Sequence, residues 1–534
     1  MDSSAIFVKY RTLECNDCAL YVDIIRLLHN LQRSDLALSD ARLTVKMLVD
    51  SRWVDAVEGG LDQIRNKATG ELIDTVPRAT AVDAAGAVDA AQSGKARMSA
   101  MAAHERSAVL QRAADAIHAN QESLSRLLAQ ENGKTVREIR SEVLAAIRIF
   151  RGYAEEAKRV FGRVTPLDSI PGHDQSLALT IRQPRGVVAA IVPFNYPAEL
   201  WAHKVAGALA AGNAVITKPP EECPLTLLTI AGYLEQAGLP RAAHQVLTGL
   251  GEDVGAALVR SGGVDMVAMT GSTLAGKQIL RDAAETMKKV HLELGGNDAT
   301  VVCSDADPAT VADALVSGRF TSGNGQICCA VKRVLIERSI FDRVKGALVD
   351  RTRKLVLGDS LEPGTDVGPL ISEHAAERVE SQVKSAVADG AQIVIGGGRR
   401  GAFYEPTVLE GVHPQNVVFK EEIFGPVLPL IPFDDFDEAL VLANDSQYGL
   451  QAAIFTDHMP RIMQAFRTLN VGTVVVNHTT AIRLENLPFG GTKMSGNARE
   501  GLHETLLDMT EVKTLLVSNA FSNGLREHPA HGHA

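Results

Sequence analysis

The sequence predicts an α/β protein with two doubly wound domains, each built on a mostly parallel sheet. The first observation is a series of short β-branched runs that alternate with helical patterns from Leu177 onward. The second is a similar series between Asp307 and Val476. Strands separated by helices of this length imply right-handed crossovers between parallel strands. The length of 534 residues fits roughly two to four domains and excludes a single small module.

The first series predicts strands at residues 187–192, 214–217 and 264–269, and helices that start near Ala198, Leu225 and Leu274. The second series predicts strands at residues 334–337, 392–395, 452–455 and 473–476. Ahead of both, two long stretches at 105–130 and 134–160 carry apolar residues at helical spacing. We expect these two stretches to be helical and amphipathic.

The composition excludes several classes of protein. With 46% hydrophobic and 22% charged residues the chain is globular, and its net charge of -10 offers no basic surface for nucleic acid or an anionic membrane. The six cysteines show no disulfide framework, which favours a reducing, cytoplasmic location. The N-terminus lacks the pattern of a signal peptide, and the sequence contains no run of 18 apolar residues. We therefore expect a small-molecule substrate and neither a nucleic-acid nor a membrane partner.

Two glycine-containing segments compete as phosphate-binding turns. Gly396, Gly398 and Gly401 satisfy the GxGxxG pattern, but an extended segment follows them instead of a helix, which favours a hairpin loop. Gly271 and Ser272 follow an apolar strand and open a helix, so free N–H groups there can bind a pyrophosphate. A simple N-cap is the alternative for Ser272.

Polar side chains also follow the strand that ends near residue 217. Lys218 and Glu221 lie at its carboxyl end, where open α/β sheets bind ligands. A carboxylate there can accept both hydroxyls of an adenosine ribose, and the ammonium group can bridge the same sugar. The alternative is an ordinary connection between a strand and a helix.

Two adjacent cysteines, Cys328 and Cys329, follow a glycine-rich turn at residues 323–326. A cysteine on a tight turn can be exposed and nucleophilic, whereas its neighbour packs as a small apolar group. Two buried thiols are the alternative. Glu293 lies at the end of another strand and is a candidate general base, which favours the catalytic interpretation.

Eight ordered motifs resemble those of the NAD(P)-dependent aldehyde dehydrogenase superfamily. They are PFNYP (193–197), KPPE (218–221), GSTLAG (271–276), LELGGN (292–297), GQIC (325–328), DVGPLI (366–371), EEIFGPV (421–427) and PFGGTKMSG (488–496). The resemblance covers about residues 47–517, with Gly323 and Ala498 as departures beside the site. It implies the hydrolytic, non-acylating type, because relatives that transfer the acyl group to coenzyme A generally lack the glutamate at Glu293.

The resemblance implies a role for each matching residue. Cys328 is the nucleophile, Asn195 the oxyanion-hole amide, Glu293 the deacylation base, and Lys204 and Glu500 a proton-relay pair. The implied cofactor contacts are Val192, Phe194, Lys218, Glu221, Gly251, Ser272, Glu422 and Phe424. We expect NAD, because Glu221 would meet the 2′-phosphate of NADP, although NADP is not excluded.

The implied reaction oxidises an aldehyde to its carboxylate through a cysteine thiohemiacetal and a thioester. The implied substrate contacts are Tyr196, His203, Ile327, Arg483 and Phe489, with Leu200, Ser322 and Cys329 beside them. This mixed set favours a small polar or anionic aldehyde, although Arg483 can instead anchor a loop. The alternatives are a coenzyme A-acylating enzyme and a catalytically silent scaffold or binding protein on the same fold.

The implied architecture has two Rossmann-like domains and a small β arm for oligomerisation. Residues 47–294 form an NAD(P)-binding domain, with 165–186 contributing to the arm, and residues 295–485 form a catalytic domain. Residues 486–517 form a return segment and an oligomerisation strand. Its end, 511–517, has no obvious partner within its own domains, so we expect a homodimer or homotetramer.

Both ends of the chain lie outside the matched motifs. Residues 1–46 hold a CxxC pair, Cys15 and Cys18, but no second pair or His cluster beside it, so we expect no metal site. One hypothesis is that translation starts at Met47, where the family's first strand begins. The alternative is a genuine extension, in which residues 23–32 form a short amphipathic helix. We expect residues 518–534 to be a disordered tail.

Overall fold

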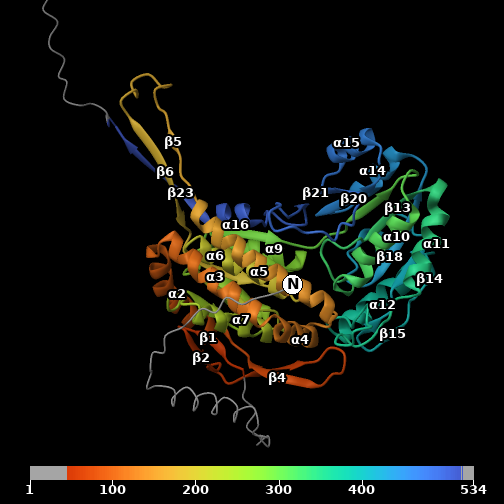
Figure 1. The fold of residues 1–534 in the computed structure, drawn as a ribbon, viewed down its shortest axis with the longest axis horizontal. Coiled ribbons are helices and arrows are strands. Elements are labelled where there is room, and N and C mark those ends of the chain that lie inside the picture. Colours follow the sequence, from red (N-terminus) through yellow and green to blue (C-terminus); the bar gives the residue numbers. More distant parts are fainter. Residues whose placement is uncertain (1–44, 519, 521–534) are drawn as a thin grey trace, which may run out of the picture. The chain divides into compact units, whose positions relative to one another are not determined.

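The computed structural model describes residues 45–518 and residue 520. The predictions for residues 1–44, including the CxxC pair and the segment 23–32, lie outside the described residues, as does most of the tail. Within the described part, two seven-stranded sheets form the framework. This arrangement confirms the predicted α/β fold class with two doubly wound sheets (Figure 1).

The first sheet has the strand order β11-β10-β7-β8-β9-β1-β2. Its parallel strands are β7 (Val187–Ile191), β8 (Ala214–Lys218), β9 (His244–Val246), β10 (Met266–Thr270) and β11 (Lys289–Glu293). An antiparallel hairpin of β1 (Met47–Val49) and β2 (Arg52–Val54) completes one edge. The chain proceeds from β7 to β8 and β9 on one side, and then to β10 and β11 on the other. Such a reversal opens a ligand-binding crevice at the carboxyl ends of β7 and β10.

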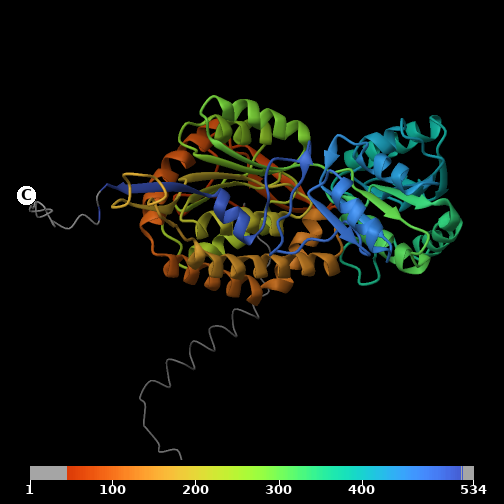
Figure 2. The same cartoon turned by 90° about the horizontal axis from the view of Figure 1, so that it is seen from above.

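Helices cover both faces of this sheet, because successive residues of each strand point to opposite sides. Val188 and Ala190 of β7 pack against one layer, whereas Val187 and Ala189 pack against the other. Figure 2 shows helices on both sides of this sheet. The first layer contains α3 (Ala103–Ala119), α4 (Gln121–Asn132), α5 (Val136–Glu156), α6 (Pro197–Ala210), α7 (Leu225–Gln236) and α16 (Leu502–Asp508). The second contains α2 (Ala81–Ala100), α8 (Ala256–Arg260) and α9 (Thr273–Ala284).

The helical pattern at residues 105–130 spans two helices, α3 and α4, because the chain turns at Asn120. The Asn120 side chain donates to the carbonyl of Ala116 at 2.9 Å and so satisfies a terminal carbonyl of α3. The apolar spacing continues across this turn because both helices face the same core. The pattern at residues 134–160 corresponds to α5.

The second sheet has the order β14-β17-β18-β13-β12-β20-β21. Its strands are β12 (Ala299–Val302), β13 (Arg333–Glu337), β14 (Gln392–Ile395), β17 (Thr407–Glu410), β18 (Val427–Phe433), β20 (Gln451–Phe455) and β21 (Thr473–Val476). One face packs on α10 (Pro308–Val316) and α11 (Phe341–Thr352). The other packs on α12 (Glu373–Ala388), α13 (Val417–Lys420), α14 (Phe436–Asn444) and α15 (Met459–Thr468). All strands except β14 run parallel to their neighbours.

The glycines that satisfy GxGxxG belong to a hairpin, as predicted. After Gly396 and Gly398 the chain forms β15 (Arg399–Arg400) and β16 (Phe403–Tyr404), which pair antiparallel around Gly401. No helix N-terminus faces these glycines, so they do not form a dinucleotide-binding turn.

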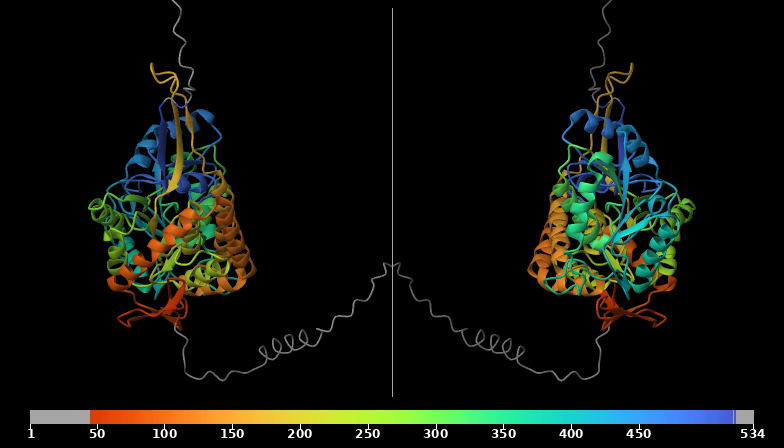
Figure 3. Two further views of the ribbon diagram at one scale, coloured as in Figure 1. Left: turned by 90° about the vertical axis from the view of Figure 1, so that its left-hand side faces the viewer. Right: turned by 90° about the vertical axis from the view of Figure 1, so that its right-hand side faces the viewer.

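A three-stranded arm projects from the first domain and contains β5 (Val164–Thr165), β6 (Leu177–Pro184) and β23 (Thr510–Val517) (Figures 1 and 3). The expectation that 511–517 lacks a partner in its own chain is wrong. β23 pairs antiparallel with β6 along its whole length, from Thr510 opposite Pro184 to Val517 opposite Leu177. Spacing alone could not reveal this pairing, because more than 300 residues separate the two strands. Two further pairs are β3 (Leu61–Arg65) with β4 (Leu72–Pro77), and β19 (Tyr448–Gly449) with β22 (Thr492–Lys493).

Candidate active site

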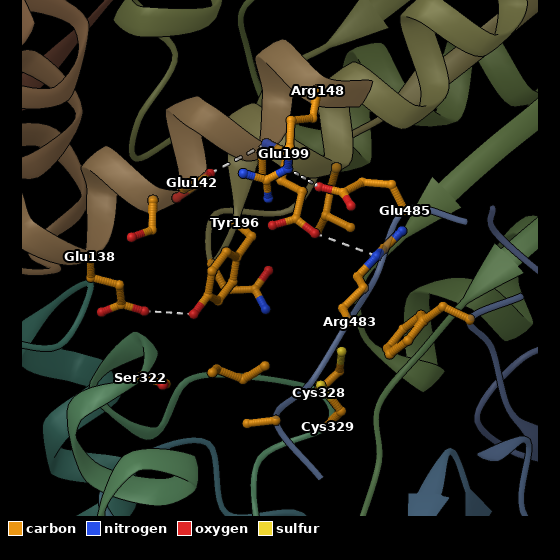
Figure 4. Close-up of a pocket in the computed structure, with 17 residues that line it drawn as sticks. Glu138, Glu142, Arg148, Tyr196, Glu199, Ser322, Cys328, Cys329, Arg483 and Glu485 are labelled. Atoms are coloured by element: carbon orange, nitrogen blue, oxygen red, sulfur yellow. Dashed lines mark hydrogen bonds and ion pairs between the residues drawn. The ribbon is translucent and has the colours of Figure 1, made fainter. Parts of the chain in front are cut away.

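A cavity of about 340 Å³ lies between the two sheets, next to the carboxyl end of β7 (Figure 4). Its lining residues come from α5, from the turn after β7 and the start of α6, from the cysteine loop, and from residues 481–489. They are Glu138, Ser141, Glu142, Ala145, Arg148, Asn195, Tyr196, Glu199, Leu200, Ser322, Ile327, Cys328, Cys329, Ala481, Arg483, Glu485 and Phe489. The structure thus brings together the predicted nucleophile, the predicted oxyanion-hole amide and four of the five predicted substrate contacts.

The cysteine loop adopts a backbone that depends on glycine. Gly323, Asn324 and Gly325 all have positive φ, at 59°, 51° and 75°. A Cβ on Gly325 would lie 2.4 Å from the carbonyl carbon of Gly425, so no larger residue fits there. The Asn324 side chain fixes the turn by donating to the carbonyls of Gly133 and Pro369.

Cys328 is half-buried and Cys329 is buried, and both line the cavity. A hydrogen bond to Cys329 and burial raise the pKa of the Cys328 thiol well above its ordinary value. The positive charge of Lys332 acts in the opposite direction. The thiol is therefore the resting form at neutral pH, and its attack on an aldehyde requires a group that accepts the proton.

Asn195 occupies the turn between β7 and α6, and its side chain is held in the cavity wall. Asn132 fixes this turn by donating to the carbonyl of the preceding residue, Phe194, at 2.5 Å. Asn195 is 6% exposed, and its Oδ1 has no hydrogen-bond partner among the described residues. An amide in this position can donate to an oxyanion that forms on the carbonyl attacked by Cys328.

Glu293 ends β11 and lies behind the cavity, outside its immediate lining. Its side chain is buried, and Oε1 lacks a hydrogen-bond partner in the described part of the chain. Burial, assisted by the charge of Glu500, raises the pKa of Glu293 well above its ordinary range. Gly490 leaves room for the carboxylate, since a Cβ on it would lie 2.5 Å from Oε1. A buried carboxyl with a raised pKa is suited to general base chemistry near neutral pH.

Lys204 and Glu500, the predicted relay pair, are in contact. Nζ of Lys204 donates to Oε2 of Glu500 at 3.1 Å and to Oγ1 of Thr270 at 2.7 Å. Arg483 approaches the other oxygen of Glu500 at 3.3 Å. Burial acts to raise the pKa of Glu500. These two cations outweigh burial and hold that pKa far below its usual value. Glu500 is therefore ionised while Glu293 resists ionisation, so the two carboxyl groups are suited to different tasks.

Arg483 both lines the cavity and anchors a loop, so the structure combines the two roles considered for it. Its Nε pairs with Glu199 at 3.4 Å, and its guanidinium stacks on Phe489 with 4.6 Å to the ring centroid. Tyr196 donates its hydroxyl proton to Glu138 at 2.5 Å. Together with Ile327 these side chains form the walls above the nucleophile.

His203 is the one predicted substrate contact that the structure places elsewhere. It lies on the face of α6 that packs against α5, where Nδ1 meets the hydroxyl of Tyr153 at 3.2 Å. Its side chain is 1% exposed and does not reach the cavity. Burial and the charge of Arg483 lower the pKa of His203 well below its ordinary value, so the ring is neutral.

Sequence reasoning missed the part of the wall that α5 contributes. Glu138, Glu142 and Arg148 lie on one face of α5 and line the cavity, and Arg148 forms an ion pair with Glu485 at 2.6 Å (Figure 4). The available signal was Glu142, a charged residue at a position of the helical pattern where buried apolar side chains otherwise stand. Lys134 pairs with Glu142 at 2.5 Å, and its Nζ lies 3.5 Å from the centre of the Tyr196 ring.

The residues assigned to a dinucleotide gather along the carboxyl ends of β7, β8 and β10. The carboxylate of Glu221 holds Lys218 as an ion pair and accepts from the N–H of Gly251 at 2.8 Å. Ser272 caps α9 by accepting from the N–H of Ala275. Ser272 and Leu274, at the start of α9, are exposed to solvent. Both observations fit a cofactor, because a carboxylate suits ribose hydroxyls and an open helix start suits a pyrophosphate.

A second group of assigned residues lies nearer the nucleophile. The rings of Phe194 and Phe424 meet edge to face at 5.9 Å between centroids. Glu422 accepts from the N–H of Gly296 at 3.2 Å. Val192 is buried at the end of β7, where its N–H donates to the carbonyl of Lys218. Both groups therefore include a carboxylate, Glu221 in the first and Glu422 in the second, that an extended dinucleotide could contact.

Two features are absent from the described residues. None of their helices is long and apolar enough to cross a membrane. Likewise, no group of three or more His, Cys, Asp or Glu side chains within residues 45–518 is arranged to hold a metal ion.

Comparisons with known proteins agree with this site. The aldehyde dehydrogenase family model matches residues 53–515. The 3-sulfolactaldehyde dehydrogenase of Priestia aryabhattai is 42% identical over 415 residues, which are 78% of this chain and 86% of that protein. The mitochondrial succinate-semialdehyde dehydrogenase of Arabidopsis thaliana is 39% identical over 478 residues, or 89% of each protein.

A solved structure is similar over most of both chains. It is the crystal structure of aldehyde dehydrogenase 21 from Physcomitrella patens in complex with the reaction product succinate. Its TM-score is 0.86 at 36% sequence identity, and the match covers 90% of this chain and 99% of that chain. The resemblance carried by the eight motifs is thereby confirmed. The chain belongs to the aldehyde dehydrogenase family and is an NAD(P)-dependent aldehyde dehydrogenase.

Proposed function

We propose that the protein oxidises a short aldehyde with an anionic group at its far end, using NAD and the nucleophile Cys328. The observation that carries this proposal is one cavity whose lining includes Cys328 and Asn195 together with two arginines, Arg148 and Arg483. In this arrangement the aldehyde carbonyl lies over the thiol, while the anionic group points toward Arg483 and Arg148.

Each catalytic residue performs a distinct step. The thiol proton of Cys328 leaves to solvent water as Sγ bonds to the carbonyl carbon, and the Asn195 amide donates to the oxygen that gains the charge. The residues assigned to the cofactor, Glu221 and Glu422 among them, would hold NAD(P), which would supply the hydride acceptor that turns the thiohemiacetal into a thioester. Glu293 then takes a proton from water, whose oxygen attacks the thioester carbon and displaces the Cys328 sulfur. The proton that Glu293 holds then leaves to solvent water, while Glu500 and Lys204 stay charged as an ion pair.

The size and charge of the cavity support a small substrate. A volume of about 340 Å³ suits a chain of few carbons, and the walls contain polar groups instead of an apolar tunnel. The relatives named above act on 3-sulfolactaldehyde and succinate semialdehyde, which both carry an anion a few bonds from the aldehyde. Arg148 supports the same class, because its side chain is 60% exposed at the mouth of the cavity.

The cofactor preference rests on Glu221. Its carboxylate already accepts from Gly251 and pairs with Lys218, so it is held where a ribose 2′-hydroxyl can donate to it. A 2′-phosphate in that place would face the same negative charge. We therefore propose NAD as the preferred cofactor, with Lys218 reducing the discrimination against NADP.

The arm supports assembly into a dimer or tetramer. β23 is an edge strand, and its side chains Val512, Leu515 and Leu516 are all more than half exposed. Exposed apolar residues on an unpaired strand edge favour pairing with a second copy of the chain. Mass measurement in solution at micromolar concentration tests this, and a monomer would contradict it.

A matched panel of aldehydes tests the proposed substrate class. Succinate semialdehyde and 3-sulfolactaldehyde are compared with butanal, each with NAD, with NADP, and with and without coenzyme A. We expect kcat/KM at least about tenfold higher for the anionic aldehydes, since one ion pair contributes on the order of 1.4 kcal/mol. Equal values for butanal would refute the anionic class, and a requirement for coenzyme A would refute hydrolysis. The variant Cys328→Ala is the control and should be inactive.

A further inference from the structure

Lys332 is a buried lysine between Cys328 and β13, and none of the steps above uses it. Its side chain is 1% exposed. Its Nζ donates to the carbonyl of Cys328 at 3.1 Å, to the carbonyl of Gly296 at 3.1 Å and to Oε1 of Glu422 at 2.8 Å. An ammonium group has three donors, so these three acceptors satisfy it completely. Two of these acceptors, the Cys328 carbonyl and the Glu422 carboxylate, belong to two different parts of the predicted active site, and the Gly296 carbonyl is the third.

One part carries the nucleophile and the other carries the carboxylate assigned to the cofactor. Gly295 and Gly296 separate them and allow very close packing. A Cβ on Gly296 would lie 2.5 Å from the carbonyl oxygen of Cys328, and a Cβ on Gly295 would lie 2.3 Å from Oε2 of Glu422. Because the backbone is packed this tightly, neither acceptor can move far while Lys332 binds both.

We propose that Lys332 is a positioning residue that ties the backbone of the nucleophile Cys328 to the cofactor-binding carboxylate Glu422. The inference rests on the roles proposed above for those two residues. It adds a link between them: a cofactor that fixes Glu422 also fixes the peptide carrying the thiol. Removal of Lys332 should therefore weaken cofactor binding and alter the thiol even when no aldehyde is present.

The charge of Lys332 provides a readout that a purely structural role would not move. The hydrogen bond to Cys329 and burial raise the pKa of the Cys328 thiol, and Lys332 opposes that rise. Glu422 also acts on the thiol, in the same direction as Cys329. The other charged or titratable groups that interact with Cys328 are Glu293, Asp298 and Arg483. Arg483 is also a cation, but it already pairs with Glu199 and Glu500, so loss of the Lys332 ammonium group should still make the thiol harder to ionise.

The test uses K332M, which keeps the length of the side chain but removes its charge, and K332R, which keeps the charge. K384M is the matched control, because Lys384 is 72% exposed on α12. The first readout is the rate of alkylation by iodoacetamide against pH without cofactor, after subtraction of the rate in Cys328→Ala. The second is the Kd for NAD from calorimetric titration.

We expect K332M to move the alkylation midpoint upward by about one pH unit, since a neighbouring charge shifts a thiol by roughly that much. The Kd for NAD should rise about tenfold, which corresponds to about 1.4 kcal/mol. K332R should keep the midpoint near that of the unmodified enzyme, and K384M should change neither quantity. An unchanged midpoint or an unchanged Kd in K332M overturns the proposal.

The variant K332M removes the cation that neutralises Glu422. The Kd for NAD is therefore also measured for E422Q and for K332M/E422Q. Thermal unfolding verifies that each variant folds. If Lys332 acts through Glu422, then E422Q should weaken NAD binding less in the K332M background than in the unmodified enzyme. Strictly additive effects would refute the link. The outcome is separable from the proposed function, because activity retained in Cys328→Ala would refute the nucleophile and leave the NAD titration unaffected.

Discussion

Replacement of Glu293 by glutamine should separate oxidation of the aldehyde from hydrolysis of the thioester. The carboxyl is buried, and its Oε1 has no partner among the described residues, so an amide of equal size fits without breaking a hydrogen bond. The amide cannot accept a proton from water. Attack by Cys328 and loss of the hydride precede that step, so Glu293→Gln leaves them in place.

The size of the effect follows from the role of the base. Loss of a general base costs about 100- to 10,000-fold, so kcat should fall by that factor while about one NADH still forms per active site. The pH dependence gives a second measure. Burial and the charge of Glu500 raise the pKa of Glu293, and a base works only when ionised. Turnover by the unmodified enzyme should therefore rise with pH through that raised pKa, and the variant should lose this rise.

Stopped-flow measurement of NADH formation tests both statements. Mixing Glu293→Gln with a saturating aldehyde and NAD should give a rapid burst followed by very slow turnover. Cys328→Ala is the control and should show no burst. Absence of a burst in Glu293→Gln, or steady turnover close to that of the unmodified enzyme, would refute the reasoning.

Three further outcomes are expected. Cys329→Ala should retain most activity and lower the alkylation midpoint of Cys328, because the hydrogen bond that raises its pKa is lost; an upward shift would contradict this. Gly490→Ala should lower the free energy of unfolding by about 1–3 kcal/mol in a denaturation experiment, because its Cβ would lie 2.2 Å from the carbonyl oxygen of Ala498, and unchanged stability would count against the contact. Glu221→Gln should reduce the ratio of kcat/KM for NAD over NADP, and a ratio that stays constant would exclude Glu221 as its origin.

The central fold could be predicted from the sequence because its signals are local. Buried parallel strands such as 187–192 and 214–217 appear as continuous runs of apolar residues, and the helices between them carry their own spacing. The proposed nucleophile Cys328 follows a glycine-rich turn and the proposed base Glu293 ends a strand, and both signals are equally local. For this reason Cys328, Glu293 and Lys218 could be selected before any contact was known.

The residues that surround the nucleophile could not be selected in the same way. Arg483 meets Glu199 and Glu500 only because the return segment crosses the first domain, and no spacing in the sequence encodes that crossing. The side chains of α5 that line the cavity share a helical pattern with many that do not. His203 was expected at the substrate because its position resembles one in the family's pocket, yet the rotation of α6 turns it toward Tyr153.

The sequence by itself therefore determined the elements and the reactive groups of this protein, since both depend on neighbours within a few residues. Only the tertiary structure decided the protonation of those groups, because the pKa values of Glu293 and Glu500 depend on burial and on charges far away in the chain. It likewise decided the pairing of β23 with β6 and the contact of Lys332 with Glu422. The physical reason is that desolvation and long-range pairing are properties of the packed chain, which local spacing does not record.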